Sequence, residues 1–418
     1  MWFSPSPVDE AITYFNAMSG PYTAPPEMVK VWAEEMGKIN DWVTSIGGEV
    51  AELNIFNPEF PELAGNESAK TYAAPTPFKA QLWNLLKTNV DDRGIEILYD
   101  SPAKELVQNP ETKEILGVIV EQSGQEIAVK AKKAVIMTCG GFENNQEMVR
   151  DYLHWDVGYP KGTPYNTGDG IKMATAVGAD LWHMGNVAGP DFNFKAPEFD
   201  FAFGYSLSPG EKSWIMVGAD SKRFIDAKAG TRHGKVLMHG RWEPNPVPLP
   251  VHCIFDEKVR AAKGLYYNYE QFCWYSIVDK YLWSEDNMTE IEKGWIIKAD
   301  SIQELAEKIG RDPAELEATV NEYNAACAAG VDEKFGTAAE NLVAIDAPPY
   351  YALEMFPTFT NTQGGPRRNE KAQILDVQGN PIPRLYSAGE FGSIYGYIYN
   401  GGGNVGECMA FGQIAAKN

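Results

Sequence analysis

The last twenty residues of the chain, "YNGGGNVGECMAFGQIAAKN" (399–418), contain a G-x-G-x-x-G pattern at Gly401, Gly403 and Gly406, followed by a helical pattern. Glycines at this spacing between a strand and a helix are typical of a loop that binds a dinucleotide pyrophosphate. An acidic residue that binds a ribose follows such a loop about 20 residues later. The sequence ends at Asn418, before that position, so these glycines need another explanation.

The composition limits the class of protein and its partners. The chain has 418 residues, of which 44% are hydrophobic, enough for a large core in two domains or in one domain with a large insert. The net charge of −21 repels nucleic acids, anionic membranes and small dianions, so neither nucleic acid nor membrane is an expected partner. No apolar run approaches the roughly 20 residues of a membrane helix, so we expect no membrane segment.

The cysteines and histidines give no pattern of a disulfide or metal site. Five cysteines are scattered without a C-x-x-C pair, and five histidines show no ligand spacing. We therefore expect reduced thiols, no metal and a cytoplasmic location. The opening "MWFSPSPVDE" (1–10) lacks the basic and apolar stretches of a signal peptide.

Hydrophobic periodicity and turn residues predict the order of elements. Helical patterns cover 8–46, 77–93 and 169–179, and short strands cover 94–141, with a three-stranded ribbon leading into the apolar strand 134–138. The middle of the chain is rich in aromatic residues and ends in two helices; Asp300 or Ser301 can cap the first, and Asp312 can cap the second. Strand patterns return at 350–357, 372–376 and 385–389.

This order predicts one α/β domain made from both chain ends and interrupted by an α+β domain. The expected parts are 1–186 and 349–418 for the first domain and 187–348 for the inserted one.

Five segments, taken in order, resemble the fumarate reductase / 3-ketosteroid dehydrogenase flavoprotein family. They are "KAVIMTCGGFENN" (133–145), "NTGDGIKMATAVGADL" (166–181), "IGRDPAELEATVNEYNAACAAGVDEKFG" (309–336), "TQGGPRRNEKAQILDVQGNPIPRLYSAGE" (362–390) and "RLYSAGEFGSIYGYIYNGGGNVGECMAFGQIAAK" (384–417). The resemblance covers most of the chain. It implies a Rossmann-like FAD-binding domain built from both chain ends, with an inserted cap domain over the flavin. The implied reaction is hydride transfer between flavin N5 and a carbon–carbon bond.

The chain departs from this family at its beginning. Family members begin with a strand, a G-x-G-x-x-G loop, a helix and an acidic residue, and residues 1–20 contain none of these. The chain thus resembles an N-terminally truncated member that lacks the first βαβ unit. We therefore expect it to bind FAD weakly or not at all, because the helix start that carries the pyrophosphate is missing.

The resemblance implies a set of FAD contacts. Glu390 matches the acid on the ribityl hydroxyls, and the amides of Asn404 and Val405 would open the last helix toward the flavin pyrimidine edge. A helix N-terminus carries partial positive charge, which suits the negative charge of a reduced flavin. The remaining matches are Gly402 and Gly403 at the ring, Thr138, Gly140 and Gly141 near the phosphate and adenosine, and Ala103 at the adenine.

The residues around the last glycines distinguish the two branches of this family. Fumarate reductases carry an arginine before the last Gly-Gly-Asn and a histidine in His-Thr-x-Gly-Gly; here these places hold Asn400 and Asn361. Ketosteroid dehydrogenases carry Tyr-Pro-Gly-Ala-Gly, which matches 399–403 at the tyrosine and both outer glycines. By this resemblance the Tyr399 hydroxyl and the Gly403 amide would hold a substrate ketone. Arg232 matches the catalytic arginine of fumarate reductases only after a one-residue shift.

A second tyrosine usually exchanges a proton with the substrate in the ketosteroid branch. The inserted domain offers five candidates, and the sequence does not choose among them: Tyr205, Tyr266, Tyr267, Tyr269 and Tyr275. The aromatic stretches 199–205 and 265–275 are either the core of that domain or a flat apolar wall for a steroid-like substrate.

The predicted function is an FAD-dependent oxidoreductase acting on a CH–CH bond beside the carbonyl of a small, neutral, apolar substrate. An unidentified electron donor or acceptor is the expected partner. One alternative is fumarate-type reduction of an unsaturated carboxylate. Another, of a different class, is a non-catalytic remnant.

Overall fold

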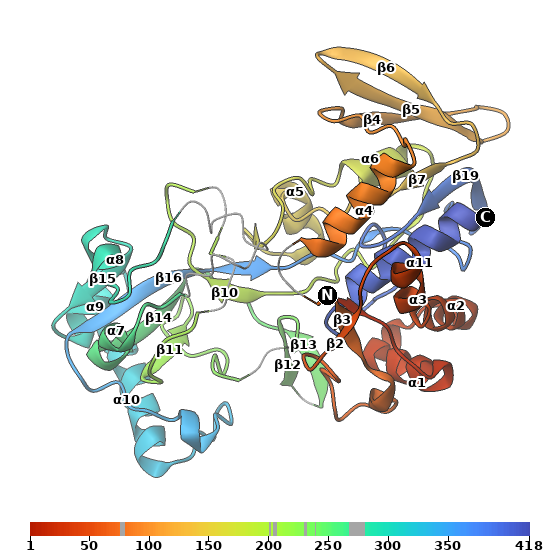
Figure 1. The fold of residues 1–418 in the computed structure, drawn as a ribbon. Helices are drawn as coiled ribbons and strands as arrows, with labels where there is room; N and C mark the ends of the chain where they lie inside the picture. Colours follow the sequence, from red (N-terminus) through yellow and green to blue (C-terminus); the bar gives the residue numbers. More distant parts are fainter. Residues whose placement is uncertain (76–79, 200–201, 204–206, 230–231, 239, 267–280) are drawn as a thin grey trace. The chain divides into compact units, whose positions relative to one another are not determined.

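The computed structural model describes residues 1–75, 80–199, 202–203, 207–229, 232–238, 240–266 and 281–418 (Figure 1). The chain forms a mixed α/β fold that divides into two compact units. Unit 1 comprises 1–154, 165–187 and 361–418, and unit 2 comprises 155–164 and 188–360.

Unit 1 contains both ends of the chain. Its helices are α1 (Val8–Ser19), α2 (Pro26–Met36), α3 (Ile39–Ser45), α4 (Gln81–Asp92), α5 (Gln146–Met148), α6 (Asp169–Ala176) and α11 (Gly403–Lys417). Its strands are β1 (Trp2–Phe3), β2 (Ala51–Leu53), β3 (Thr71–Ala73), β4 (Ala103–Gln108), β5 (Ile115–Gln122), β6 (Gln125–Lys130), β7 (Val135–Met137), β9 (Leu181–Trp182), β17 (Gly365–Pro366), β18 (Gln373–Leu375) and β19 (Pro381–Ser387).

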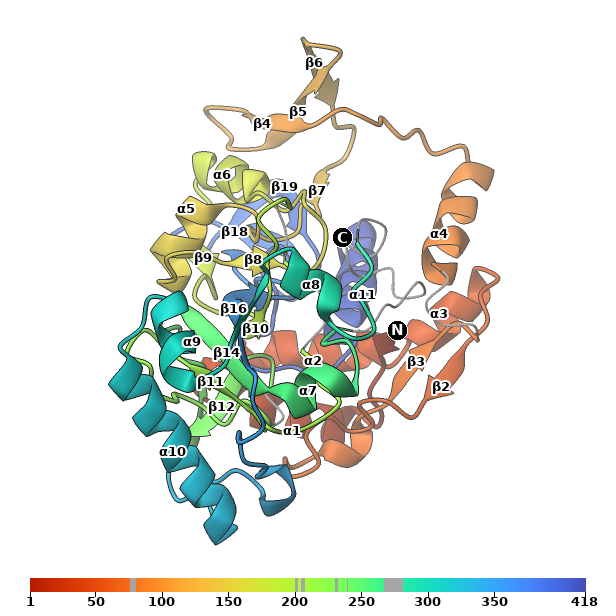
Figure 2. The same ribbon diagram turned by 90° about the vertical axis from the view of Figure 1, so that its left-hand side faces the viewer.

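A small sheet in unit 1 joins two distant parts of the sequence. Its strand order is β18-β19-β7, and β19 runs parallel to β7, with Leu385 opposite Val135 and Ser387 opposite Met137. The expected contact between the returning C-terminal strands and the strand at 134–138 is thus present. The antiparallel ribbon β4-β5-β6 also forms as expected, and Figures 1 and 2 show it projecting beyond β7 and β19.

The expected strand structure between residues 94 and 102 is wrong. The first strand there is β4, which begins at Ala103, and 95–98 have no regular structure. Ile95 and Tyr99 are more than half exposed, and Ile136 of β7 is 41% exposed. Strands in parallel sheets are normally covered on both faces. The apolar residues at 95–99 form no strand, because none of the described strands lies beside them to supply backbone hydrogen bonds.

The first helices pack an aromatic cluster against the segment that precedes α11. Phe15 and Trp32 lie with ring centroids 4.7 Å apart, and Trp32 contacts the edge of Tyr395 at 6.2 Å. The Trp32 indole N–H also donates to the Tyr395 hydroxyl at 3.1 Å. The helices α1 and α2 therefore fix the path of the chain just before the glycine-rich turn.

Unit 2 is built on a mixed sheet whose central strand is β16 (Tyr350–Phe359). Its other strands are β8 (Tyr159–Pro160), β10 (Asp191–Asn193), β11 (Trp214–Val217), β14 (Val251–Asp256) and β15 (Ile296–Ala299), and β12 (Lys235–Met238) pairs separately with β13 (Arg241–Pro244). Its helices are α7 (Glu257–Ala262), α8 (Met288–Glu292), α9 (Ile302–Lys308) and α10 (Pro313–Ala329). The expected boundary at residue 348 therefore requires correction, because β16 pairs with β14 and β15 inside unit 2.

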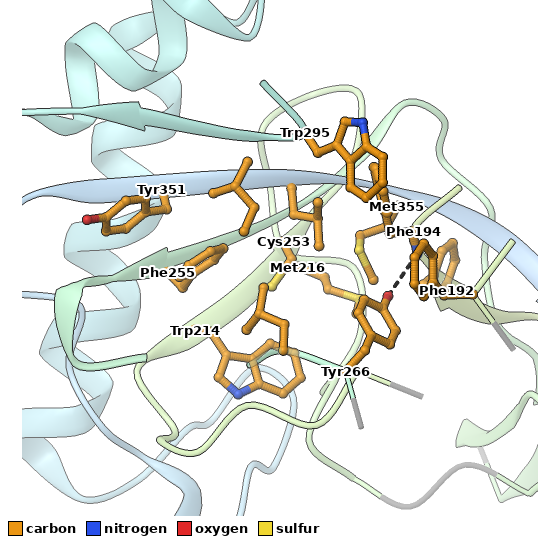
Figure 3. Packing of buried hydrophobic residues seen from close by; sticks show 14 of the residues in the cluster. Phe192, Phe194, Trp214, Met216, Cys253, Phe255, Tyr266, Trp295, Tyr351 and Met355 are labelled. Carbon is orange, nitrogen blue, oxygen red and sulfur yellow. Dashed lines mark hydrogen bonds between the residues drawn. The ribbon is translucent and has the colours of Figure 1, made fainter. Parts of the chain in front are cut away.

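The core of unit 2 is aromatic (Figure 3). Phe203, Leu265 and Tyr266, from the two aromatic stretches, are buried in it, and the Tyr266 hydroxyl accepts a hydrogen bond from the Phe194 amide at 2.8 Å. The expected caps also form: Ser301 accepts from the Glu304 amide, and Asp312 accepts from the amides of Ala314 and Glu315. The described aromatic residues of these two stretches, Phe199, Phe203 and Tyr266, are thus part of this core or pack against it.

None of the helices in the described ranges combines the length and apolar character needed to cross a membrane.

Candidate active site

The glycines before α11 allow close packing of the protein on itself. Gly402 precedes α11 in the left-handed region, with φ of 85°, and a Cβ there would lie 2.9 Å from the Trp2 carbonyl carbon. A Cβ on Gly406 would lie 2.5 Å from the Met36 methyl carbon, and one on Gly401 would lie 2.4 Å from the Phe56 ring. Packing therefore accounts for the spacing without a pyrophosphate.

The carboxyl ends of β7 and β19 lie at one edge of their sheet, because the two strands run parallel. Thr138, Gly140 and Gly141 follow β7, and Glu390 follows β19. The Asn404 amide in the first turn of α11 donates to a Glu390 carboxyl oxygen at 3.4 Å. The structure thus brings together most of the expected FAD contacts: two loops and one helix start (Figure 1).

The glycine turn after β7 is tightly constrained on one side. Gly140 has φ of 68°, and a Cβ there would lie 2.6 Å from the Asn166 amide oxygen. A Cβ on Gly141 would lie 2.0 Å from the Thr362 hydroxyl. Thr138, by contrast, is exposed, as is Val405 in the first turn of α11. The edge thus combines a rigid backbone with accessible residues.

Two acids lie at this edge. Glu143 is buried, and one carboxyl oxygen accepts from the Thr362 amide at 2.5 Å and from its hydroxyl at 3.1 Å. Its other oxygen has no partner among the described residues, and neither has the Gln363 side-chain oxygen. Burial raises the pKa of Glu390 well above its usual value, and the charges of Glu143 and Glu407 raise it further. The two acceptor oxygens without partners, on Glu143 and Gln363, fit a ligand rich in hydroxyl groups, such as the ribityl chain of a flavin.

Tyr399 and Gly403, the expected substrate contacts, both have partners inside the protein. Tyr399 is 5% exposed, and its hydroxyl donates to the Asn361 amide oxygen at 3.1 Å. The Gly403 amide donates to the Asn400 carbonyl at 2.8 Å. Tyr399 therefore lies beside Asn361, one of the two residues expected to distinguish the branches of the family.

Asn400 has a structural role. Its side-chain oxygen accepts from the Tyr14 hydroxyl at 3.0 Å and from the Glu59 amide at 3.1 Å. Its side-chain nitrogen donates to the Phe56 carbonyl at 3.0 Å. Because these bonds occupy the side chain, Asn400 ties α1 and the 56–59 loop to the turn before α11.

The remaining expected site residues belong to the β4-β5-β6 ribbon or to unit 2. Ala103 starts β4 and pairs with Val120 in the antiparallel ribbon. Arg232 belongs to unit 2, where its guanidinium lies 4.7 Å from the Trp242 ring centroid. Burial raises the pKa of Tyr266, which disfavours it as a base. The other four candidates for the second tyrosine lie outside the described residues: Tyr205, Tyr267, Tyr269 and Tyr275.

Sequence reasoning missed Glu143 and the buried ion pair between Arg368 and Glu407. A signal existed for Glu407, because it is the sole acid in the apolar segment 403–416. No local pattern indicates that Arg368 is its partner. Among the described residues, no cluster of three or more His, Cys, Asp or Glu side chains is arranged to bind a metal.

A site at the carboxyl ends of parallel strands and beside a helix start is typical of nucleotide-binding α/β proteins. The chain belongs to the FAD binding domain family, which it matches over residues 6–190 and 207–405. FAD is accordingly its cofactor.

Comparisons with individual proteins give relatives in both branches. The chain is 30% identical over 329 residues to a 3-oxosteroid 1-dehydrogenase of Mycobacterium tuberculosis, covering 71% of this chain and 54% of that protein. It is 25% identical to a probable fumarate reductase of Shewanella frigidimarina, covering 94% of this chain and 61% of that protein. The chain therefore spans little more than half the length of these relatives.

Solved structures share the fold. A 3-ketosteroid Δ1-dehydrogenase from Sterolibacterium denitrificans matches with a TM-score of 0.75 at 20% identity, covering 99% of this chain and 89% of that one. A flavocytochrome c3 fumarate reductase matches with a TM-score of 0.67 at 23% identity, covering 98% of this chain and 66% of that one.

Proposed function

We propose that this chain is the FAD- and substrate-binding part of an oxidoreductase that acts on a CH–CH bond beside a carbonyl. Unit 1 corresponds to the Rossmann-like FAD-binding part, and unit 2 to the cap. Support comes from the family membership and from relatives named as 3-oxosteroid dehydrogenases, a fumarate reductase and an acrylate oxidoreductase. An external electron donor or acceptor completes the reaction. The scattered cysteines support a cytoplasmic location.

Unit 1 offers a chemically suitable set of cofactor contacts. Glu390 and Asn404 would bind the ribityl hydroxyls, and the turn at Gly140 and Gly141 would contact the phosphate and adenosine side. The amides in the first turn of α11 would face the pyrimidine edge, where a helix N-terminus favours negative charge. When bound, FAD supplies the acceptor or donor of the hydride.

The hydrogen bond between Tyr399 and Asn361 is the observation that carries the proposal. When a ketone binds, the Tyr399 hydroxyl would donate to the ketone oxygen instead of to Asn361. Hydride addition at the β-carbon of an enone places negative charge on that oxygen, and a fixed donor stabilises it. The Gly403 amide is a second donor only if it leaves the Asn400 carbonyl. Tyr399 is therefore the main group proposed to hold the carbonyl.

The residues beside Tyr399 favour a neutral substrate. Asn361 is uncharged, and Asn400 is occupied by bonds to the protein. A dicarboxylate would meet neither of the ionisable groups that fumarate reductases hold at these places, and the net charge of −21 would repel it. An apolar enone, such as a steroid-like ketone, avoids both costs.

The test is a reoxidation experiment. The protein is saturated with FAD, reduced anaerobically with dithionite and mixed with a steroid enone or with fumarate while flavin absorbance is followed. The proposal predicts reoxidation by the enone that is faster than with free reduced FAD and faster than with fumarate. Reoxidation by fumarate alone would support the carboxylate alternative, and reoxidation by neither would contradict the proposed activity.

A further inference from the structure

Unit 1 contains an ion pair that is shielded from solvent. Arg368 follows β17, and Glu407 lies one turn into α11. Both side chains are fully buried, and a guanidinium nitrogen of Arg368 contacts a carboxyl oxygen of Glu407. Charges at such sites are costly unless further hydrogen bonds satisfy them, so their other partners indicate what the pair does.

Those partners belong to one loop. Arg368 Nη1 donates to the carbonyls of Gly389 and Phe391, both at 3.3 Å, which are the residues on either side of Glu390. Glu407 accepts from the Ser393 hydroxyl at 2.6 Å and from the Ile394 amide at 2.7 Å. The ion pair thus binds the 389–394 loop at four points.

The loop needs such restraint. Gly389 and Gly392 have φ of 74° and 76°, and glycine loses the most conformational freedom on ordering. Between them stands Glu390, whose carboxyl reaches Asn404 in the first turn of α11. Because Glu407 belongs to the same helix, its bonds fix the loop relative to that helix start.

We propose that Arg368 and Glu407 are positioning residues that hold Glu390 at the start of α11 in the geometry that FAD requires. This inference rests on the proposed cofactor role of Glu390. An apolar pair of similar volume often stabilises a core as well as an ion pair does. Such a pair would remove these hydrogen-bond partners from two carbonyls, one amide and the Ser393 hydroxyl proton, which favours a positioning role for the two charged residues.

The test substitutes Arg368→Lys, which keeps the charge but loses the planar fork that reaches the carboxylate and both carbonyls. Hydrogen exchange of the FAD-free protein is followed by mass spectrometry for a peptide spanning 389–396. We expect exchange there to accelerate by about tenfold or more, while peptides from β16 in unit 2 change little. FAD affinity, from fluorescence quenching, should fall by about tenfold.

A matched control is the buried pair of Arg223 and Asp332 in unit 2. Arg223→Lys weakens a comparably buried ion pair, but it should leave exchange at 389–396 and FAD affinity unchanged. If Arg368→Lys does not fold, Glu407→Gln replaces it, because the amide keeps the shape of the carboxyl while losing its charge. Glu407→Gln should also accelerate exchange at 389–396 and weaken FAD binding, both by less than Arg368→Lys does.

Three results would overturn the proposal. One is unchanged exchange at 389–396 in the folded variant, and another is an equal acceleration of that peptide by Arg223→Lys. The third is a mobile loop with unchanged FAD affinity. Failure of the wild-type chain to bind FAD would instead contradict the proposed function, and the exchange measurement would still show whether the ion pair orders the loop.

Discussion

Replacing Tyr399 by phenylalanine keeps the aromatic ring and removes only the hydroxyl. The ring contact with Tyr395, at 5.3 Å between centroids, is retained, so the core packing should survive. The lost hydroxyl leaves the buried Asn361 oxygen without this donor, at a cost in unfolding free energy of about 1–3 kcal/mol. The variant should therefore remain folded in a protein of ordinary stability.

The effect on the reaction should be larger. Removal of one donor to a developing oxyanion typically lowers kcat by about 10²–10³, equivalent to about 2.7–4 kcal/mol. We expect a fall of this size in the rate at which an enone reoxidises reduced flavin bound to Tyr399→Phe. The assay is anaerobic stopped-flow at 450 nm with saturating FAD, with binding of FAD measured separately.

Tyr14→Phe provides the control. Its hydroxyl is also buried, and it donates to Asn400 rather than to the proposed substrate position. It should cost similar stability but slow reoxidation little. Near-full activity of Tyr399→Phe, or an equal loss in Tyr14→Phe, would refute the assignment of Tyr399 as the carbonyl donor.

Three further outcomes are expected. Asn400→Arg should lower the free energy of unfolding, measured by urea titration, by about 3–5 kcal/mol, because it removes the buried hydrogen bonds of Asn400 and buries a charge in their place. A gain of fumarate reduction in this variant would contradict the structural role of Asn400. Burial alone would raise the pKa of Asp332, but hydrogen bonds from Arg223 and Thr337 outweigh burial and lower the pKa to about 2. The ionised Asp332 carboxylate therefore stabilises the fold above pH 4, and this contribution is lost as pH falls toward 2. Asp332→Asn should remove this part of the pH dependence of the free energy of unfolding. Burial lowers the pKa of His183 to about 4, so the folded protein holds this side chain neutral and its free energy of unfolding should fall as pH falls from 6.5 to 4. His183→Gln should remove this part of the pH dependence, and an unchanged pH profile in the variant would contradict the expectation.

The features predicted correctly from the sequence depend on local signals. The antiparallel ribbon follows from alternating apolar residues and turn residues, and the caps at Ser301 and Asp312 follow from side chains beside their own helices. The last helix, which the resemblance implied would open near Asn404 and Val405, begins at Gly403. In each case the residues that determine the element lie within a few positions of it.

The errors and omissions depend on distant partners. The strand pattern at 95–99 found no neighbouring strand, and β16 joined unit 2 because its partners are β14 and β15. The pairing of Arg368 with Glu407 joins residues 39 positions apart, and no local pattern indicates it. Gly401 and Gly406 of the G-x-G-x-x-G pattern resemble a pyrophosphate loop, but each packs against a residue that is distant in the sequence, Phe56 and Met36 respectively.

The central claim is that the edge formed by the ends of β7 and β19 and the start of α11 binds FAD. Fluorescence titration of FAD with the 418-residue chain tests it directly, with Glu390→Ala as the variant and Glu111→Ala, on an exposed turn, as the control. We predict one site, weakened by Glu390→Ala and unaffected by Glu111→Ala. Absent binding, or binding that Glu390→Ala does not weaken, would contradict the site.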